Sequence, residues 1–216
     1  APQSIAAAAT GRKLRLILTF HAEMEQNRDV IVPCRTGAEV DRAAADGKMA
    51  AILSIEGAEL IGCDPGQVET AAEWGVRFLN PVWNWPNVLS GANCRDTDRG
   101  LSPLGADFLR QLEAFHIYPD VSHISDPGFW NVVRLARGPV VATHSNSRAL
   151  CPHRRNLTDD MFRAIRDSGG VPHCACGGLI KPDVVLYEEG LDEKTIKGAV
   201  RAVAEADVLI VGGTSL

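Results

Sequence analysis

The stretch "GKMAAILSIEGAELIG", residues 47–62, contains the first of several segments that indicate the fold class of this chain. Its segment 49–56 is an apolar run with the length of a buried β-strand, and it ends on an acid, Glu56. Three further runs have the same character and predict further strands. They are "VRFLNPVW" at 76–83, "IYPDVSH" at 117–123 and "PVVATHS" at 139–145.

Helical patterns separate these predicted strands. Thr158 is followed by Asp159 and Asp160, a favourable helix start with acids in the first turn. The alternation of strand and helix predicts an α/β fold with parallel strands. It fits part of a (β/α)₈ TIM-type barrel, although an open doubly wound sheet would give a similar string. The predicted helices are 36–47, 65–74, 103–115, 126–137 and 158–167.

A polar side chain stands at the end of each predicted strand. These residues are Glu56, Asn80, His123 and His144. In a barrel the carboxyl ends of the strands face one mouth, where the active site lies. Carboxylate and neutral imidazole are suitable zinc ligands, so the pattern predicts a metal site. The alternative, in which each strand-end histidine is a hydrogen-bonded structural residue, stays open.

Composition sets limits on function. The 216 residues are 45% hydrophobic and 23% charged with a net charge of −5, which argues against non-specific binding to nucleic acid. No apolar run approaches the roughly 20 residues that cross a bilayer, and the start has no signal-peptide pattern. Scattered single cysteines favour a reducing compartment, so a cytoplasmic location is predicted. They are Cys34, Cys63, Cys94 and Cys151.

Several long motifs, in order, resemble the membrane (renal-type) dipeptidases over about residues 13–171. These zinc metallopeptidases are built on a (β/α)₈ barrel and hydrolyse dipeptides with two zinc ions that share a bridging carboxylate. Besides residues 47–62, the motifs are "GLSPLGADFLRQLEAF" (100–115), "DVSHISDPGFWNVV" (120–133), "PVVATHSNSRALCPHRRNLTDD" (139–160) and "FRAIRDSGGV" (162–171).

The resemblance implies roles for four residues. Glu56 is similar to the catalytic bridging carboxylate, and His123 and His144 resemble the histidine ligands of the second zinc. Arg155 looks like the arginine that binds the substrate carboxylate, a task that suits a guanidinium fork. Without the resemblance, Arg155 would be read as a solvated loop residue. Two metals in such a site activate a water and stabilise charge on the attacked carbonyl oxygen.

The chain also departs from the family pattern. The early His-x-Asp motif that supplies ligands to the first zinc is absent, and we expect it to precede residue 1. His21 of "HAE" is no substitute, because its segment reads as a helix surface. Trp85 stands where relatives carry a substrate-contacting His, and the family's later strands have no counterpart after Val171. Activity of this chain is therefore expected to be impaired.

From Ser168 the chain resembles a different family. The stretch "PHCACGGLIKPDVVLYEEGLDEKTIKGAVRAVAEADVLIVGGTSL", residues 172–216, is similar to the sirtuins, which are NAD-dependent protein deacylases. The resemblance implies that Cys174 and Cys176 are half of a four-cysteine zinc site. It also implies that the loop after the last strand touches NAD through Gly213, Thr214 and Ser215.

The residues themselves predict a short Rossmann-like βαβ tail, with strands at 184–187 and 208–213 around a helix at 192–206. The cysteine pair lacks a partner pair at the required spacing, and two thiolates do not complete a tetrahedral zinc site. The alternative is that both are free thiols.

The sequence therefore predicts two parts, a dipeptidase-like segment 1–170 and a sirtuin-like segment 171–216. Both families accept "SGGV" (168–171), which motivates the hypothesis that two partial coding sequences are joined there. The leading function is zinc-dependent hydrolysis of dipeptides. The alternatives are an NAD-dependent deacylase fragment and a non-catalytic chimera, and a homo-oligomer is an open possibility.

Overall fold

The computed structural model describes residues 15–169 and 193–205. The chain divides into two compact units, Ala1–Ile180 and Lys181–Leu216, and each is treated by itself. The second unit contributes one described element, helix α7 (Glu193–Glu205), which confirms the helix predicted at 192–206. The strands predicted at 184–187 and 208–213 lie outside the described residues.

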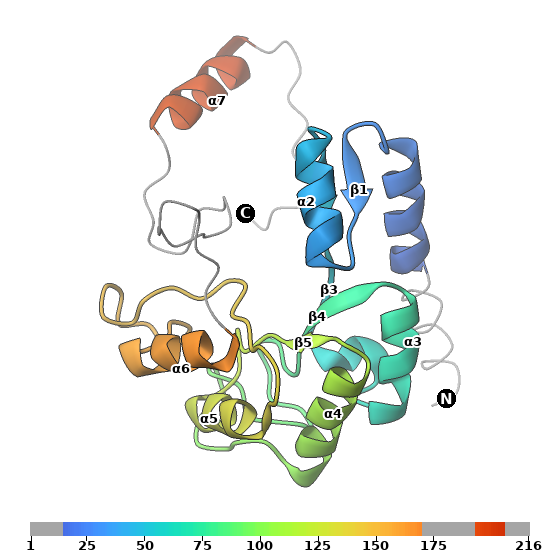
Figure 1. Cartoon of the computed structure of the whole chain (residues 1–216). Helices are drawn as coiled ribbons and strands as arrows, with labels where there is room; N and C mark the ends of the chain where they lie inside the picture. The colour runs from blue at the N-terminus through green and yellow to red at the C-terminus, as the bar shows by residue number, and fades with distance from the viewer. Residues whose placement is uncertain (1–14, 170–192, 206–216) are drawn as a thin grey trace, which may run out of the picture. The chain divides into compact units, whose positions relative to one another are not determined.

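The first unit contains two small parallel sheets. One pairs β1 (Ile31–Pro33) with β2 (Met49–Ala51), and the other has the order β3 (Leu53–Glu56), β4 (Val76–Asn80), β5 (Tyr118–Pro119) (Figure 1). β2 and β3 follow each other with one residue between them. The single strand predicted at 49–56 is therefore present in two halves, of which one pairs with β1 and the other with β4. β1 was not predicted.

The later strands are shorter than predicted. β4 ends at Asn80, where Pro81 follows and cannot donate to a strand ladder. The predicted strand 117–123 contains β5 alone before the chain turns, and His123 has a positive φ of 75°. The predicted strand 139–145 is reduced to one parallel bridge between Asp120 and Val141. The parallel order continues there through two hydrogen bonds, Val141 N to Pro119 O at 3.0 Å and Val121 N to Val141 O at 2.8 Å.

The predicted helices all form, because their starts carry strong local signals. Thr36 makes a capping box with Glu39, and Ser102 and Ser125 each cap a helix that has proline in its first turn. Residues 15–26 are also helical. The remaining elements are α2 (Gly37–Ala45), η1 (Ala58–Ile61), η2 (Pro65–Gln67), α3 (Val68–Glu73), α4 (Pro103–Ala114), α5 (Asp126–Leu135) and α6 (Asp159–Gly169).

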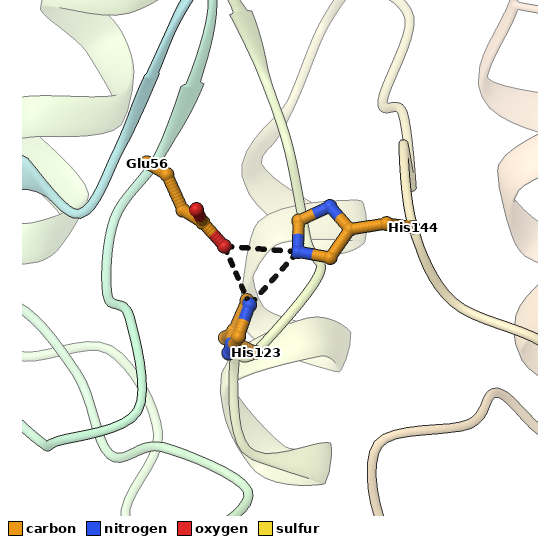
Figure 2. A group of neighbouring side chains, drawn as sticks. All are labelled: Glu56, His123 and His144. Atoms are coloured by element: carbon orange, nitrogen blue, oxygen red, sulfur yellow. Dashed lines mark hydrogen bonds and ion pairs between the residues drawn. The ribbon is translucent and has the colours of Figure 1, made fainter. Parts of the chain in front are cut away.

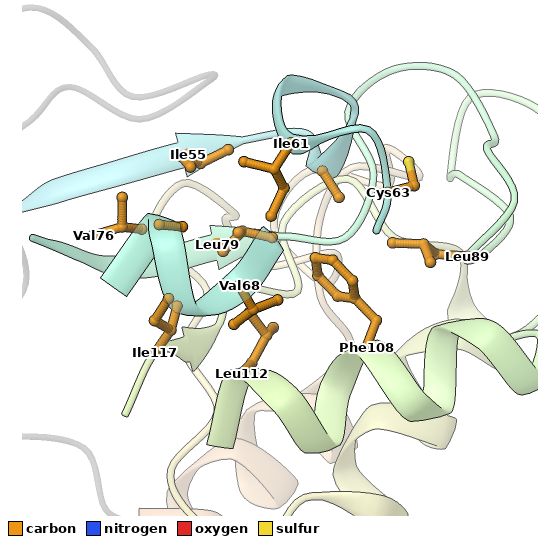
Figure 3. Close-up of a cluster of buried hydrophobic side chains, with 12 residues drawn as sticks. Ile55, Ile61, Cys63, Val68, Val76, Leu79, Leu89, Phe108, Leu112 and Ile117 are labelled. Carbon is orange, nitrogen blue, oxygen red and sulfur yellow. The ribbon is translucent and has the colours of Figure 1, made fainter. Parts of the chain in front are cut away.

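Two clusters of buried apolar side chains hold the first unit together. In the first, side chains of β3 and β4 meet α3 and α4, and Figure 3 shows Phe108 and Leu112 of α4 reaching toward Val68 and Leu79. The second cluster joins the chain after β5 to α5 and α6, with Phe129 and Met161 fully buried. Helix packing on the parallel strands thus confirms a mixed α/β fold. Within residues 15–169 the strands do not close into a barrel.

Candidate metal centre

Three of the predicted site residues meet at one point. Glu56 is the last residue of β3, His123 follows β5, and His144 follows the Asp120–Val141 bridge. His123 Nε2 lies 2.8 Å from Glu56 Oε1 and 2.8 Å from His144 Nε2, and His144 Nε2 lies 3.1 Å from the same carboxylate oxygen. Figure 2 shows the three side chains pointing toward one another. Residues distant in sequence are brought together because parallel strands end at the same edge.

The three side chains differ in their access to solvent. The His123 side chain is 7% exposed, whereas those of His144 and Glu56 are 33% and 49% exposed. Burial, followed by the positive charges of Arg155 and His144, lowers the pKa of His123 to about 3. His123 is therefore a neutral imidazole, the form in which a ring nitrogen can bind a metal. Glu56 supplies a negative charge at the open side of the group.

Hydrogen bonding alone does not account for these contacts. An imidazole nitrogen carries either one proton or one lone pair, yet His123 Nε2 has Glu56 Oε1, His144 Nε2 and Arg155 Nη2 within 3.1 Å. Ligand atoms about 2.0–2.2 Å from a shared zinc ion lie roughly 3 to 3.5 Å apart, close to the spacing found here. The geometry and the donor types therefore fit a divalent metal held by these three residues.

Arg155 joins the same group from a separate loop. Its Nη2 atom lies 3.1 Å from His123 Nε2 and donates to the carbonyl oxygen of His144 at 3.3 Å. The guanidinium group is thus beside the candidate metal ligands and is not a solvated loop arginine. A cationic fork there is able to bind a carboxylate that approaches the same centre.

The loop that carries Arg155 is held by side chains that the sequence did not single out. The Asn156 side chain accepts from Asn146 N at 3.1 Å and donates to Cys151 O at 2.9 Å. Arg148 donates to the carbonyl oxygens of Arg154 and Asn156, the residues on both sides of Arg155. These bonds position Arg155 at the centre.

A buried polar network lies behind the histidines. Asn80, predicted as a strand-end site residue, donates to the carbonyl oxygens of Asp120 at 3.2 Å and Ser122 at 3.0 Å. It is a structural residue and is not among the three converging ligands. Asp120 and Thr143 also belong to this network, and sequence reasoning missed both. The sequence contained one clue to Asp120 and Thr143, which is their position near the histidines. Asp120 is the first residue of "DVSH", and Thr143 directly precedes His144.

His21 and Trp85 take no part in the centre. His21 is exposed on the helix at 15–26, as expected, and its Nε2 lies 3.0 Å from Trp74 O. The Trp85 ring stacks under the guanidinium group of Arg95 at 4.2 Å. Trp83 lies against Gly57, the residue after Glu56, since a Cβ placed on Gly57 would lie 3.2 Å from the Cβ of Trp83.

The remaining predicted site residues lie outside the described residues, and their roles stay predictions. They are the metal candidates Cys174 and Cys176 and the cofactor-binding candidates Gly213, Thr214 and Ser215.

The chain belongs to the membrane dipeptidase family, peptidase family M19, whose model matches residues 2–204. Among curated relatives, an uncharacterised protein in the pqqA 5′ region of Klebsiella pneumoniae is 41% identical over 144 residues, 64% of this chain and 53% of that protein. The chain spans about half the length of such relatives. The expected resemblance to the dipeptidases is thereby confirmed.

Solved structures agree with this family. The probable dipeptidase PvdM of Pseudomonas aeruginosa matches with a TM-score of 0.70 and 27% identity, over 80% of this chain and 45% of that one. A metallo peptidase of Rhodobacter sphaeroides, liganded with a phosphinate mimic of the dipeptide L-Ala-D-Ala, matches with a TM-score of 0.64 and 38% identity. That match covers 70% of this chain and 45% of the other.

A second likeness is partial. An NAD-dependent protein deacetylase of Clostridium perfringens is 53% identical over 70 residues, 32% of this chain and 28% of that protein. This match suggests the sirtuin-like C-terminal segment expected from the sequence. Among the described residues, none of the helices combines the length and apolar character needed to span a membrane.

Proposed function

We propose that this chain forms the metal-binding and carboxylate-binding part of a zinc-dependent dipeptidase. One observation carries the proposal. Glu56, His123 and His144 place ligand atoms 2.8–3.1 Å apart beside the guanidinium group of Arg155. The membership of a family of metallodipeptidases supports the same reaction, and the family's (β/α)₈ barrel is proposed for the full-length fold.

Each residue has a distinct task in this proposal. Glu56, His123 and His144 would hold a zinc ion, which when bound supplies a polarised water and a Lewis acid for the carbonyl of the scissile bond. Because His123 is neutral, one of its ring nitrogens has a lone pair, and a metal would not have to displace a second proton. Glu56 is the catalytic candidate of the site, and its half-exposed carboxylate would also be open to a second metal.

Arg155 would select the substrate class. A dipeptide bound near the metal has its free carboxylate within a few ångströms of the scissile carbonyl. A guanidinium fork beside the metal ligands binds that carboxylate in two places, which favours dipeptides over longer chains. Lys in place of Arg155 would keep the charge and lose the fork.

Zinc binding by the purified chain tests the proposal directly. After dialysis against chelator and titration with zinc by calorimetry, we expect binding that His123→Ala and Glu56→Gln each weaken by at least about tenfold. His21→Ala is the matched control, because His21 is exposed on a separate helix, and it should bind as the unaltered chain does. Binding that survives His123→Ala unchanged would contradict the proposed centre.

Hydrolysis is measured on the same variants. With zinc added, we expect turnover of a dipeptide such as L-Ala-D-Ala to be low in this chain, and what turnover there is to be lost in His123→Ala and retained in His21→Ala. Arg155→Lys should raise KM more than it lowers kcat, because it weakens recognition of the substrate carboxylate. Equal turnover in all of these variants would show that the hydrolysis does not arise from this centre.

A second function, NAD-dependent deacylation, is supported by the partial deacetylase matches. It requires NAD binding through the region of Gly213, Thr214 and Ser215. Calorimetric titration of the chain with NAD tests this second function. The absence of binding at millimolar NAD would rule it out.

A further inference from the structure

Asp120 is a buried carboxylate that the proposed chemistry does not use. It is 1% exposed and lies directly after β5. Its Oδ1 atom accepts from the backbone N–H groups of Ser122 at 2.9 Å and Thr143 at 3.2 Å, and its Oδ2 atom contacts the Thr143 hydroxyl. A buried carboxylate is costly unless its oxygens are hydrogen-bonded, and here both are.

Thr143 connects this carboxylate to a candidate metal ligand. The Thr143 hydroxyl lies 2.8 Å from Nδ1 of His144, on the ring edge opposite the metal-facing Nε2. A hydroxyl group has one proton to donate, and an ionised carboxylate only accepts. The hydroxyl therefore donates its proton in a hydrogen bond to Asp120, and its oxygen accepts a hydrogen bond from the N–H group at Nδ1 of His144.

We infer that Asp120 and Thr143 form a relay that sets the tautomer of His144. With the proton held on Nδ1, the Nε2 atom of His144 presents a lone pair toward Glu56 Oε1 and His123 Nε2. The backbone of His144 is fixed from the same side, because its N–H donates to the Ser122 hydroxyl at 3.2 Å. Asp120 and Thr143 are positioning residues that prepare His144 for a metal.

His123 is held differently, which makes the relay specific to one ligand. Nδ1 of His123 is buried and has no hydrogen-bond partner among the described residues. No side chain in the described part of the chain therefore fixes the proton of His123 from behind. We conclude that His144 is the pre-oriented ligand of the pair.

The consequence for metal affinity rests on the metal centre proposed above. Loss of a group that orients a metal-binding histidine typically lowers metal affinity by about 10- to 100-fold. Thr143→Val removes the hydroxyl and keeps the side-chain shape, so it should weaken zinc binding by this factor. Thr143→Ser keeps the hydroxyl and should bind zinc within about threefold of the unaltered chain.

Asp120→Asn gives a more specific prediction, because it reverses the direction of both hydrogen bonds made by the Thr143 hydroxyl. The new amide can donate to the Thr143 oxygen, and the hydroxyl then donates to Nδ1 of His144. The proton of His144 must move to Nε2, which blocks the lone pair. Zinc affinity should fall although no ligand has been altered.

The tautomer is measured by ¹⁵N–¹H correlation spectra of the imidazole groups in the metal-free chain near pH 8, with the His144 signal assigned by its loss in His144→Gln. We expect a protonated Nδ1 in the unaltered chain and in Thr143→Ser. We expect a protonated Nε2 in Asp120→Asn and a mixture in Thr143→Val. Thr97→Val is the matched control, because Thr97 also contacts an aspartate, Asp98, through a separate, exposed hydrogen bond.

Zinc affinity, measured by competition with a chromophoric chelator, completes the test. A protonated Nε2 in the unaltered chain would overturn the relay, as would unchanged spectra and zinc affinity in both Thr143→Val and Asp120→Asn. Failure of the metal centre is distinguishable from these results. A chain whose His144 has the proton on Nδ1 but which binds no zinc keeps the relay and loses the proposed function.

Discussion

The guanidinium group of Arg148 binds both carboxylate oxygens of Asp126, at 2.7 Å and 2.8 Å. Asp126 is in the first turn of α5, so this ion pair fastens the loop that carries Arg155 to a helix packed in the core. A two-point pair holds the direction as well as the position of the guanidinium group. The approach of Arg155 to His123 therefore depends on a pair that touches neither residue.

We expect Arg148→Met to lower the free energy of unfolding by about 1–2 kcal/mol, because it removes hydrogen bonds to a charged group that is only partly exposed. Urea unfolding measures the loss. Hydrogen exchange should also accelerate at the amides of Arg148 and Leu157, which donate across the base of the loop to Leu157 O and Asn146 O.

Arg163→Met is the control for this prediction. Arg163 pairs with Asp160 within α6, and the two side chains are 61% and 78% exposed. Such a surface pair contributes at most about 0.5 kcal/mol. An equal loss in both variants would show that the Arg148 pair has no special role.

Leu112 and Leu150 give a matched test of the core. Leu112 is fully buried in the first cluster, whereas Leu150 is 84% exposed. We expect Leu112→Ala to lower the free energy of unfolding by about 2–5 kcal/mol, because it leaves a cavity. Leu150→Ala should change it by less than about 0.5 kcal/mol. Thermal or urea unfolding measures both changes. A similar loss of unfolding free energy in the two variants would contradict the packing described.

Gly91 lies where two backbone segments touch. A Cβ placed on Gly91 would lie 2.2 Å from the carbonyl oxygen of Asp96 and 2.4 Å from that of Arg99. Because backbone atoms cannot move aside cheaply, Gly91→Ala should destabilise by about 1–3 kcal/mol. Apart from its chain neighbours, no atom of the described residues lies within 4 Å of the same position on Gly138, so Gly138→Ala should be neutral or slightly stabilising. Paired urea unfolding curves measure both, and a neutral Gly91→Ala would refute the close approach.

The cysteines should differ in reactivity and in its pH dependence. Burial, assisted by the charge of Glu39, raises the pKa of the Cys34 thiol above its usual value of 9.0, and the thiol donates to Val32 O at 3.6 Å. Thiolates are the reactive form, so iodoacetamide at pH 8 should label exposed Cys94 and spare Cys34 until the chain unfolds.

The raised pKa of Cys34 also determines how the stability of the fold changes with pH. Above pH 9 the unfolded chain releases the Cys34 proton more readily than the folded chain, so stability should fall as pH rises through that range.

The labelling of each cysteine by iodoacetamide is measured by peptide mass spectrometry at successive times. Equal labelling of Cys34 and Cys94 in the native state would contradict the burial of Cys34.

Much of this molecule follows from local sequence. Ser102 and Ser125 with the prolines that follow them determine where α4 and α5 begin, because a cap and a proline act within one turn. The position of Glu56, His123 and His144 at the ends of apolar runs indicated one shared site, since parallel strands end at one edge, and the family resemblance assigned all three to it. Strand lengths were not predictable in the same way, because β5 and the segment around Val141 depend on pairing partners.

The different roles of the polar residues became apparent from the folded structure. Asn80 and His123 both stand near strand ends, yet one donates to backbone carbonyl oxygens and the other lies against Glu56, a candidate metal ligand. The relay from Asp120 through Thr143 to His144 likewise joins segments that are separate in sequence. Hydrogen-bond partners of this kind are set by distances across the fold, which local sequence preferences do not contain.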